Sequence, residues 1–334
     1  MANFPGFQPG RPLMTPEEKR LSQPTPPGRV VRGNGWRLLV RADFLADFPA
    51  DRFATYEQFI AARGEVIKTE RRSRVTLLRG TGAGSPADPP RVFVLKEYRY
   101  TGARSIRTLF RTSRGEREME NLLHLHAVGV PAVEPVACGV TRDPLGMVRS
   151  TFVITRHLEG CLDLRGWQSA QGLAPAFFQK RRDLVLREVG RLLRRIHESG
   201  FFLFTPKASN ILIRPGDDMP PEIVFLDLPR AGRIRTGFLR GFAQARDLGT
   251  FLMDFPREGG PSDWEPFFEA YLPDPLGGAP DALRRRVARE VRAQRNLTPL
   301  TATVDRFKRR VREASRGPSD GATTGTRRQP SRRE

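Results

Sequence analysis

Four polar side chains in this sequence are of the types that phosphoryl transfer requires. Lys96 ends the apolar run FVLK, and Glu118 lies in the segment EREMENLL that follows. Asn210 precedes the apolar run ILIR, and Asp227 ends the run IVFLD 17 residues later. A lysine can bind phosphates, a carboxylate can hold that lysine, and an asparagine with an aspartate can ligate Mg²⁺. Each residue alone is better explained as a solvated strand end or a turn residue, so the interpretation depends on their order and on the elements that carry them.

The elements expected in the first half of the chain are mainly strands. Three segments between residues 64 and 100, GEVIKTE, RVTLLRG and RVFVLKEYRY, are rich in apolar and β-branched residues, which is typical of strands. A helix is expected over 116–127, where a glycine and a proline follow it. Two more strands are expected at 134–140 and 148–154. Lys96 would then end a strand, and Glu118 would lie in the one main helix of this half.

The second half of the chain is expected to be helical. Apolar residues recur every three or four positions over 182–197, which gives one apolar helix face. A short strand pair, NILIR and EIVFLD, follows and carries Asn210 and Asp227. Further helices are expected near 238–253, 262–272, 281–295 and 300–314. A strand-rich half with one helix, joined to a helical half, predicts an α+β fold of two lobes.

The composition is that of a folded chain with an excess of positive charge. Of 334 residues, 38% are hydrophobic, and 31 glycines bring the apolar content into the globular range. Lys and Arg number 57 against 37 Asp and Glu, and the formal net charge of +20 indicates an anionic partner or surface. Two cysteines cannot form a disulfide framework or a zinc site. The N-terminus has no secretory pattern and no apolar run suits a membrane span, so a cytoplasmic protein is expected.

Both ends of the chain are expected to lie outside the packed lobes. Residues 1–30 contain seven prolines and no apolar periodicity, and residues 316–334 also contain no periodic apolar residue. The predicted division is a Pro-rich arm at 1–30, a small lobe at 31–157, a large lobe at 158–315 and a basic tail at 316–334. The hinge between the lobes is expected near Thr155–Glu159.

The motifs, taken in order, resemble those of the lipopolysaccharide kinase (Kdo/WaaP) family, which has a protein-kinase-like fold. The matching segments, within about residues 64–255, are VLKEYR, SRGEREMENLLHLHAVGVPAVEPVA, RLLRRIHESG, ASNILI, FLDLPRAG and ARDL. The resemblance implies ATP-dependent phosphorylation of a sugar in the lipopolysaccharide core, at the cytoplasmic face of the inner membrane. It implies ATP and Mg²⁺ as cofactors, and an anionic glycolipid or sugar phosphate as acceptor.

The resemblance also assigns a phosphate site. Lys96 matches the phosphate-binding lysine, and Glu118 matches its partner, with Glu120 or Glu116 as alternatives if the register differs. Adenine is expected between the two lobes.

The resemblance assigns the metal site and the loop before it. Asn210 and Asp227 match the metal ligands, and Asp247 in ARDL matches an aspartate that braces the catalytic loop from a following helix. The family's catalytic aspartate lies five residues before the metal-binding asparagine, and that position is Thr205 here. A threonine hydroxyl cannot accept a proton near neutral pH, so the general base is missing.

The loss of this base leaves two outcomes open. Lys207 stands where kinases often keep a second phosphate-facing lysine, so the loop is altered rather than erased. Phosphoryl transfer depends mostly on positioning and charge stabilisation, and a base contributes about 10²–10⁴-fold. Slow transfer, or nucleotide binding without transfer, would each be consistent with Thr205.

A glycine-rich segment and a basic turn compete for the phosphate loop. The segment GTGAGS at Gly80–Ser85 runs into SPADPP, which favours a turn between two strands over a phosphate loop. The loop expected to cover the phosphates is Glu70–Ser73, where Arg71 and Arg72 could contact phosphates directly. A solvated hairpin tip explains these two arginines about as well.

Three classes of function follow. The first is a sugar or lipid-sugar kinase with an altered catalytic loop, and the second is a pseudokinase that binds nucleotide or glycolipid and regulates a partner in envelope biogenesis. The third is a basic nucleic-acid-associated module, since residues 281–334 carry 16 basic and 6 acidic side chains. No nucleic-acid-binding signature is present, which disfavours the third. The same basic residues would suit an anionic membrane surface, or simply keep the protein soluble.

Overall fold

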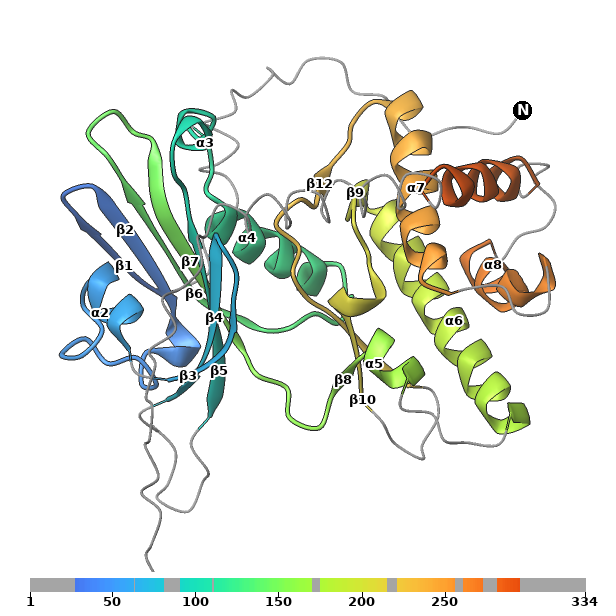
Figure 1. The fold of residues 1–334 in the computed structure, drawn as a ribbon, viewed down its shortest axis with the longest axis horizontal. Coiled ribbons are helices and arrows are strands. Elements are labelled where there is room, and N and C mark those ends of the chain that lie inside the picture. The colour runs from blue at the N-terminus through green and yellow to red at the C-terminus, as the bar shows by residue number, and fades with distance from the viewer. Residues whose placement is uncertain are drawn as a thin grey trace, which may run out of the picture.

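The computed structural model of this chain describes most of the residues between 28 and 294. The described ranges are 28–62, 64–80, 91–109, 111–169, 175–214, 221–255, 261–272 and 281–294. They form one lobe built on an antiparallel sheet and a second lobe built mainly of helices (Figure 1). The α+β, two-lobed fold predicted from the order of strands and helices is therefore confirmed.

Several expectations fall outside the described residues. They are the arm before residue 28, the GTGAGS turn after Gly80, the helix at 300–314 and the basic tail at 316–334.

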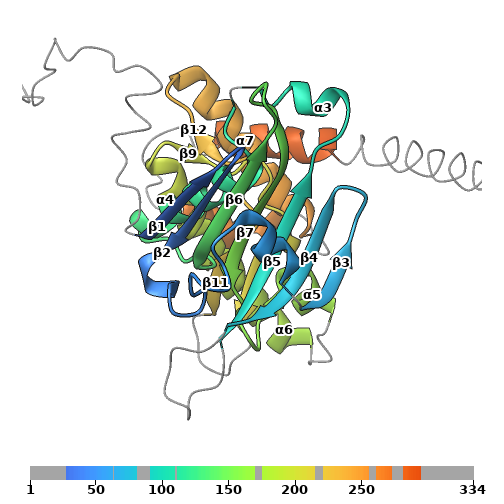
Figure 2. The ribbon, with the colours of Figure 1, turned by 90° about the vertical axis from the view of Figure 1, so that its left-hand side faces the viewer.

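The first lobe is built on a seven-stranded antiparallel sheet, which Figure 2 shows face on. Its strand order is β1-β2-β6-β7-β5-β4-β3. The strands are β1 (Gly28–Gly33), β2 (Trp36–Arg41), β3 (Glu65–Thr69), β4 (Ser73–Arg79), β5 (Val92–Arg99), β6 (Pro135–Arg142) and β7 (Val148–Arg156). The last five agree with the strands expected from the sequence.

Strands β1 and β2 were not expected. Because β1 begins at Gly28, the prediction of an unpacked arm over 1–30 is wrong for its last three residues. Arg29 lies in this strand, and its guanidinium donates hydrogen bonds to the carbonyls of Phe48 and Phe53 at 3.0 and 2.8 Å. A charged residue such as Arg29 interrupts the apolar pattern that would predict a strand here. In the fold, hydrogen bonds to distant carbonyls hold its guanidinium.

The two faces of this sheet carry different layers. On one face, α2 (Tyr56–Ala61) packs with a cluster of buried aromatic rings that includes Phe93 of β5. On the other face lies α4 (Arg114–Ala127), which contacts β6 and β7. Side chains alternate along a strand, so Phe93 and Leu95 of β5 join the aromatic cluster, whereas Lys96 lies on the α4 side.

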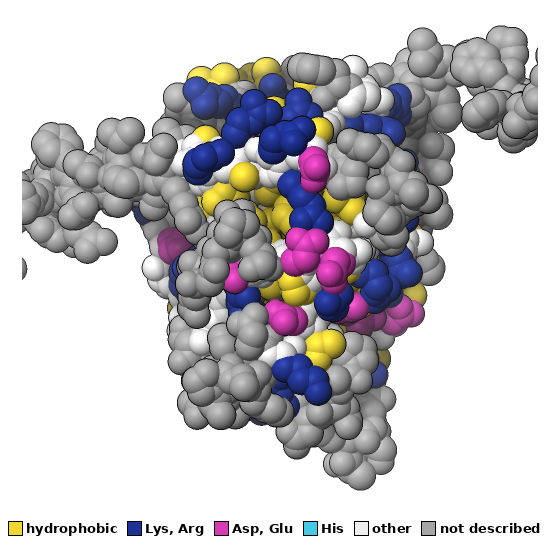
Figure 3. Space-filling model, turned by 90° about the vertical axis from the view of Figure 1, so that its right-hand side faces the viewer, with side chains coloured by type: hydrophobic (Ala, Val, Ile, Leu, Met, Phe, Trp, Pro, Cys, Tyr) yellow, Lys and Arg dark blue, Asp and Glu magenta, His cyan; other side chains and the backbone are white. Residues whose placement is uncertain are grey.

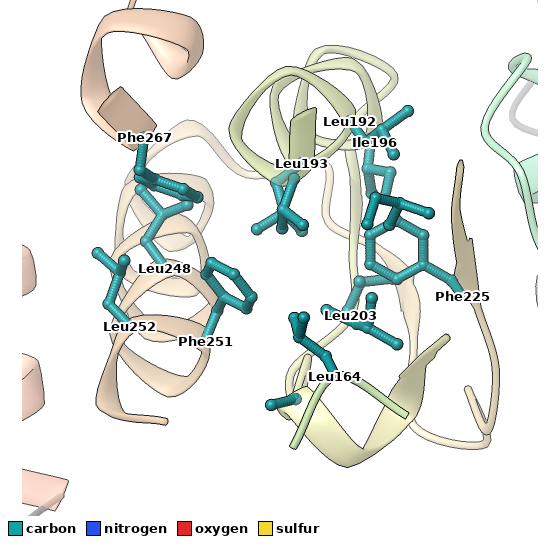
Figure 4. Packing of buried hydrophobic residues seen from close by; sticks show 14 of the residues in the cluster. Leu164, Leu192, Leu193, Ile196, Leu203, Phe225, Leu248, Phe251, Leu252 and Phe267 are labelled. Atoms are coloured by element: carbon teal, nitrogen blue, oxygen red, sulfur yellow. The ribbon is translucent and has the colours of Figure 1, made fainter. Parts of the chain in front are cut away.

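The second lobe consists of helices around two small sheets. The helices are α5 (Leu164–Ser169), α6 (Pro175–Glu198), α7 (Gly237–Met253), α8 (Glu265–Tyr271) and a helix over 281–294. The short strands are β8 (Leu162–Asp163), β9 (Phe201–Phe202), β10 (Ile211–Arg214), β11 (Glu222–Phe225) and β12 (Gly232–Arg233). Figure 4 shows side chains of α5, α6, α7, α8 and β11 meeting in one core. No helix among the described residues is both long and apolar enough to span a bilayer.

The lobes meet where the connection after α4 reaches β11. Val133 donates its backbone N–H to the carbonyl of Phe225 at 2.9 Å, and Phe225 donates to the carbonyl of Pro131 at 3.0 Å. Inside α4, the Asn121 amide donates to the carbonyl of Leu228 at 2.6 Å. These bonds fix the helix that carries Glu118 against the strand that leads to Asp227.

Candidate functional site

The centre of the candidate site is an ion pair between the two lobes. Lys96 Nζ of β5 lies 2.6 Å from Asp227 Oδ1, just after β11. The side chains keep 21% and 34% of their surface exposed, so ligands can reach both. The structure thus joins two residues that are 131 positions apart in the sequence.

Glu118 lies beside this pair but binds a different residue. Its Oε2 accepts a hydrogen bond from the Tyr98 hydroxyl at 2.8 Å, and both side chains are buried. Lys96 Nζ lies 5.3 Å from the centre of the Tyr98 ring. Of the carboxylates in the described residues, Lys96 therefore pairs with Asp227, while the predicted partner Glu118 is held by Tyr98. The pairing of Lys96 with Glu118 stays a prediction.

The environment of Glu118 favours its neutral form. Burial raises the pKa of Glu118 to about 7, the Lys96 ammonium opposes this rise, and the nearby Asp227 carboxylate adds to it. Burial, with the Glu118 and Asp227 charges, also raises the pKa of Tyr98, which keeps its hydroxyl as a donor. A carboxyl that titrates near neutrality beside a cation and a second carboxylate is typical of functional sites.

The first alternative partner of the lysine, Glu116, is engaged at the start of α4. Glu116 forms a capping box with Ser113 at the start of α4, and its carboxylate also lies 3.8 Å from Arg37 and from Arg142. Glu120 is exposed on the same helix. The charge of Lys96 acts on Glu118, the glutamate between them.

The turn between β3 and β4 lies within electrostatic reach of the central pair. A hydrogen bond from Lys68 lowers the pKa of Glu70, and the Lys96 charge adds to that effect. Arg71 at this turn is exposed and Arg72 is half-buried. Lys68 of β3 lies 2.8 Å from Glu70, whose hydrogen bond raises the pKa of Lys68, and the Asp227 charge adds to that rise. Glu70 belongs to the phosphate loop expected from the sequence, whereas Lys68 was missed in the sequence analysis.

Asn210 lies beside Asp227 because of the β10–β11 pairing. The two strands are antiparallel, with Ile211 opposite Phe225, so the residues just outside them meet at one end. The Asn210 amide donates to the carbonyl of Asp227 at 3.5 Å, and Leu226 donates its N–H to the carbonyl of Asn210 at 3.0 Å. One carboxylate and one amide oxygen are hard ligands that suit Mg²⁺, which takes its remaining ligands from water and phosphate. The donor set therefore fits the ion.

Two backbone positions at this site are strained. Phe204 and Asp227 have φ values of 62° and 56°, and they are the only non-glycine residues with positive φ in the described part of the chain. Such conformations cost about 1–3 kcal/mol each and gather at functional sites. One of them immediately precedes Thr205, and the other is the predicted metal ligand.

The loop that carries Thr205 is anchored at two points, one in α7 and one at the residue that follows it. Leu203 donates its N–H to Asp247 Oδ2 at 2.6 Å, and Ala208 donates its N–H to Asp254 Oδ2 at 2.9 Å. The two aspartates are seven residues apart, which is about two helical turns along one face. Asp247 thus has the contact that a bracing residue needs. Asp254 is a second anchor that the sequence analysis missed, and its spacing of seven residues from Asp247 is the pattern that could have indicated it.

Asp247 also belongs to a buried hydrogen-bonded chain. Its Oδ2 lies 3.2 Å from His197 Nε2, and His197 Nδ1 lies 2.7 Å from the Tyr271 hydroxyl. Gln244 donates to that hydroxyl at 2.6 Å. These contacts link Asp247 of α7 to His197 of α6 and to Tyr271 of α8.

The loop itself offers no carboxylate. Residues 203–210 read LFTPKASN; Thr205 is half-buried and Lys207 is exposed. Lys207 donates its N–H to the carbonyl of Thr205, and Asn210 donates its N–H to the carbonyl of Lys207, both at 2.8 Å. The loop keeps a compact, hydrogen-bonded shape without a general base.

The sequence of this chain is similar to those of known proteins. The profile of the lipopolysaccharide kinase (Kdo/WaaP) family matches residues 95–271, just over half of the chain. A 3-deoxy-D-manno-octulosonic acid kinase of Actinobacillus succinogenes is 26% identical over 167 residues, which cover 49% of this chain and 65% of the relative. One of Haemophilus influenzae is 24% identical over 149 residues, covering 45% and 56%. The chain therefore matches less than two thirds of the length of these relatives.

A solved structure supports the same fold. The chain resembles WaaP, solved in complex with acyl carrier protein, with a TM-score of 0.57 and 20% identity over 78% of this chain and 99% of that one. The family match begins at Leu95, one residue before Lys96, and ends in α8, so it includes the central pair and both loop anchors. The chain belongs to the lipopolysaccharide kinase (Kdo/WaaP) family.

Proposed function

We propose that this protein binds ATP with Mg²⁺ between its lobes and transfers phosphate slowly to a hydroxyl of a lipid-linked sugar. The observation that carries the proposal is the Lys96–Asp227 ion pair at 2.6 Å, with Asn210 beside it. In this pair the proposed phosphate-binding cation, Lys96, and the proposed metal-binding carboxylate, Asp227, neutralise each other's charge in the absence of nucleotide.

The residues of the site would divide the work as follows. Lys96 would turn from Asp227 to the phosphates, and Asp227 with Asn210 would hold Mg²⁺. When bound, Mg²⁺ would neutralise charge on the transferred phosphoryl group. Glu118 would ionise and hold the displaced ammonium, because a cation freed from Asp227 favours the charged carboxylate.

The acceptor class comes from the relatives. Their names describe kinases of 3-deoxy-D-manno-octulosonic acid, a sugar acid, so we propose an anionic sugar or sugar-phosphate acceptor presented at the cytoplasmic face of a membrane. Thr205 cannot take the proton of the acceptor hydroxyl, so transfer would be slower than in a relative with a base by about 10²–10⁴-fold.

A pseudokinase is the second candidate, and Thr205 is the observation that favours it.

The hypothesis of a nucleic-acid-binding module is disfavoured for the described helix at 281–294. Arg284 there forms a two-bond pair with Glu265 at 2.5 and 2.7 Å, and its Val287 and Val291 lie in the core of the second lobe. These residues are part of a packed lobe rather than a free basic arm.

Thermal melting with ATP and Mg²⁺ tests the nucleotide site. Ligand at about 100 times its dissociation constant adds roughly 2.7 kcal/mol, a shift of several degrees for a chain of this size. Lys96→Met and Asp227→Asn should abolish the shift, while Lys180→Met, which removes an exposed lysine of α6, should keep it. No shift of the parent protein at millimolar ATP would refute nucleotide binding.

A gain-of-function variant separates the two candidates. Thr205→Asp should raise phosphate transfer to a glycolipid bearing 3-deoxy-D-manno-octulosonic acid by about 10²–10⁴-fold. Thr205→Asn, of matched shape but without a base, should not. No rise in a protein that still binds nucleotide would favour the pseudokinase.

A further inference from the structure

Most of the exposed large hydrophobic side chains of the described residues lie at one end of the molecule. Nine such side chains occur in the described residues, and five of them come from three elements. These are Ile106 and Leu109 at α3 (Ala103–Ile106) and the turn after it, Leu145 in the β6–β7 turn, and Leu239 and Phe242 in α7. Figures 1 and 2, a quarter turn apart, both show α3, the β6–β7 turn and the start of α7 at the upper end. We call this surface the apolar end.

The projections of the apolar end are built into the fold. The Arg142 guanidinium donates to the carbonyl of Gly146 at 2.8 Å and to that of Arg111 at 2.9 Å, which fixes the hairpin turn against the segment after α3. On α7, Leu239 and Phe242 are three residues apart and share one helix face. The side chains of Leu145 and Phe242 are 71% and 51% exposed, so they project from the hairpin turn and from α7.

The charges around the apolar end are almost all positive. Residues 99–114 and 228–246 each contain five arginines and no aspartate or glutamate. The one carboxylate at the hairpin, Asp143, pairs with Arg149 at 3.2 Å and accepts the backbone N–H of Leu145 at 3.1 Å. Figure 3 shows Lys and Arg side chains gathered at the upper end of the helical lobe, with hydrophobic side chains at its rim and most Asp and Glu lower down.

We propose that the apolar end docks on an anionic lipid bilayer. Apolar side chains on projecting tips can enter the boundary between headgroups and acyl chains, while arginines beside them meet lipid phosphates. A folded protein partner needs a continuous complementary surface of about 800 Å², whereas these side chains project from three separate elements. Single-stranded nucleic acid needs stacking aromatics, and Phe242 is the one exposed large aromatic side chain of the described set.

This orientation also gives the site access to a lipid-linked acceptor, a point that depends on the proposed function. From Asp227 the chain runs through β12 to α7 at the apolar end (Figure 1). Asn121 of α4 holds that segment by donating to the carbonyls of Leu228 and Ala231. The acceptor would enter from the membrane along this segment. Docking itself requires no nucleotide and no acceptor.

Vesicle sedimentation of the full chain tests the docking. The probes are phosphatidylcholine vesicles, alone or with about one third phosphatidylglycerol, an anionic lipid. We expect binding to the anionic vesicles only. Leu145→Ser with Phe242→Ser leaves the charge unchanged and should weaken binding at least about tenfold, because two apolar side chains no longer enter the bilayer. Leu162→Ser, at a side chain 40% exposed on β8 of the other end, is the matched control and should not weaken it.

A second pair of variants tests the charge. Arg235→Ser with Arg246→Ser, both at exposed positions, should weaken binding by about fivefold for each arginine, at about 1 kcal/mol each. Unchanged binding of the Leu145–Phe242 variant would overturn the proposal, since basic segments elsewhere would then suffice. Failure of the parent protein to bind anionic vesicles, or preference for an acidic protein over them, would also overturn it. The assay contains no ATP, so its failure leaves the nucleotide site untouched.

Discussion

Replacing the buried carboxyl of Glu118 with an amide should stabilise the nucleotide-free protein above neutral pH. Burial raises the pKa of Glu118 from 4.5 to about 7 in the folded state. As pH rises between these values, the unfolded chain loses this proton before the folded chain does. The free energy of unfolding therefore falls across this window and is constant above it. The difference corresponds to about 3 kcal/mol at pH 8.

Glu118→Gln removes this pH-dependent fall in the free energy of unfolding while keeping the local contacts. The amide oxygen can still accept the hydrogen bond of the Tyr98 hydroxyl, which is 2.8 Å from the carboxylate in the parent protein. Relative to the parent, we expect the variant to gain about 3 kcal/mol at pH 8 and about 1 kcal/mol at pH 5.5. Urea denaturation without nucleotide at these two pH values measures both differences. Glu120→Gln, at an exposed position of the same helix, is the matched control and should not reproduce the gain.

One result would refute this reasoning. If Glu118→Gln is no more stable than the parent at pH 8, the pKa of Glu118 is not raised in the folded protein. Lys96 would then have left Asp227 to pair with Glu118 even without nucleotide.

Three further substitutions test how the site is supported. Asp247→Ala leaves the backbone N–H of Leu203 without its acceptor, so we expect a loss of about 1–3 kcal/mol of unfolding free energy in urea titrations. Asn121→Ala removes two hydrogen bonds to the segment after β11; protection of that segment in hydrogen exchange should fall, with a loss of about 1–3 kcal/mol. Gly115→Ala would place a Cβ 2.3 Å from the carbonyl oxygen of Phe152, so α4 must shift and the melting temperature should drop by several degrees. Unchanged stability in any of the three would contradict the contact on which it depends.

Much of the site's local geometry could be read from the sequence. The alternation of VFVLKEYR puts Lys96 and Tyr98 on the same face of one strand, since side chains repeat every two residues. Ser113 and Glu116 have the spacing of a capping box, which begins α4 where the structure has it. Asp227 directly follows a buried apolar run, as a strand-end residue should. These features depend on neighbours within a few positions, and local sequence determines them.

Tertiary packing decided which of these residues meet. Tyr98 binds Glu118 because α4 packs on the sheet of the first lobe. Lys96 binds Asp227 because the connection after α4 pairs with β11 and brings the second lobe against the first. Asp254 anchors the loop for the same kind of reason, since its contact with Ala208 spans 46 residues. Partners this distant leave no periodicity in the chain. The free energy of tertiary packing, within each lobe and between the lobes, determines them, and no short segment contains that information.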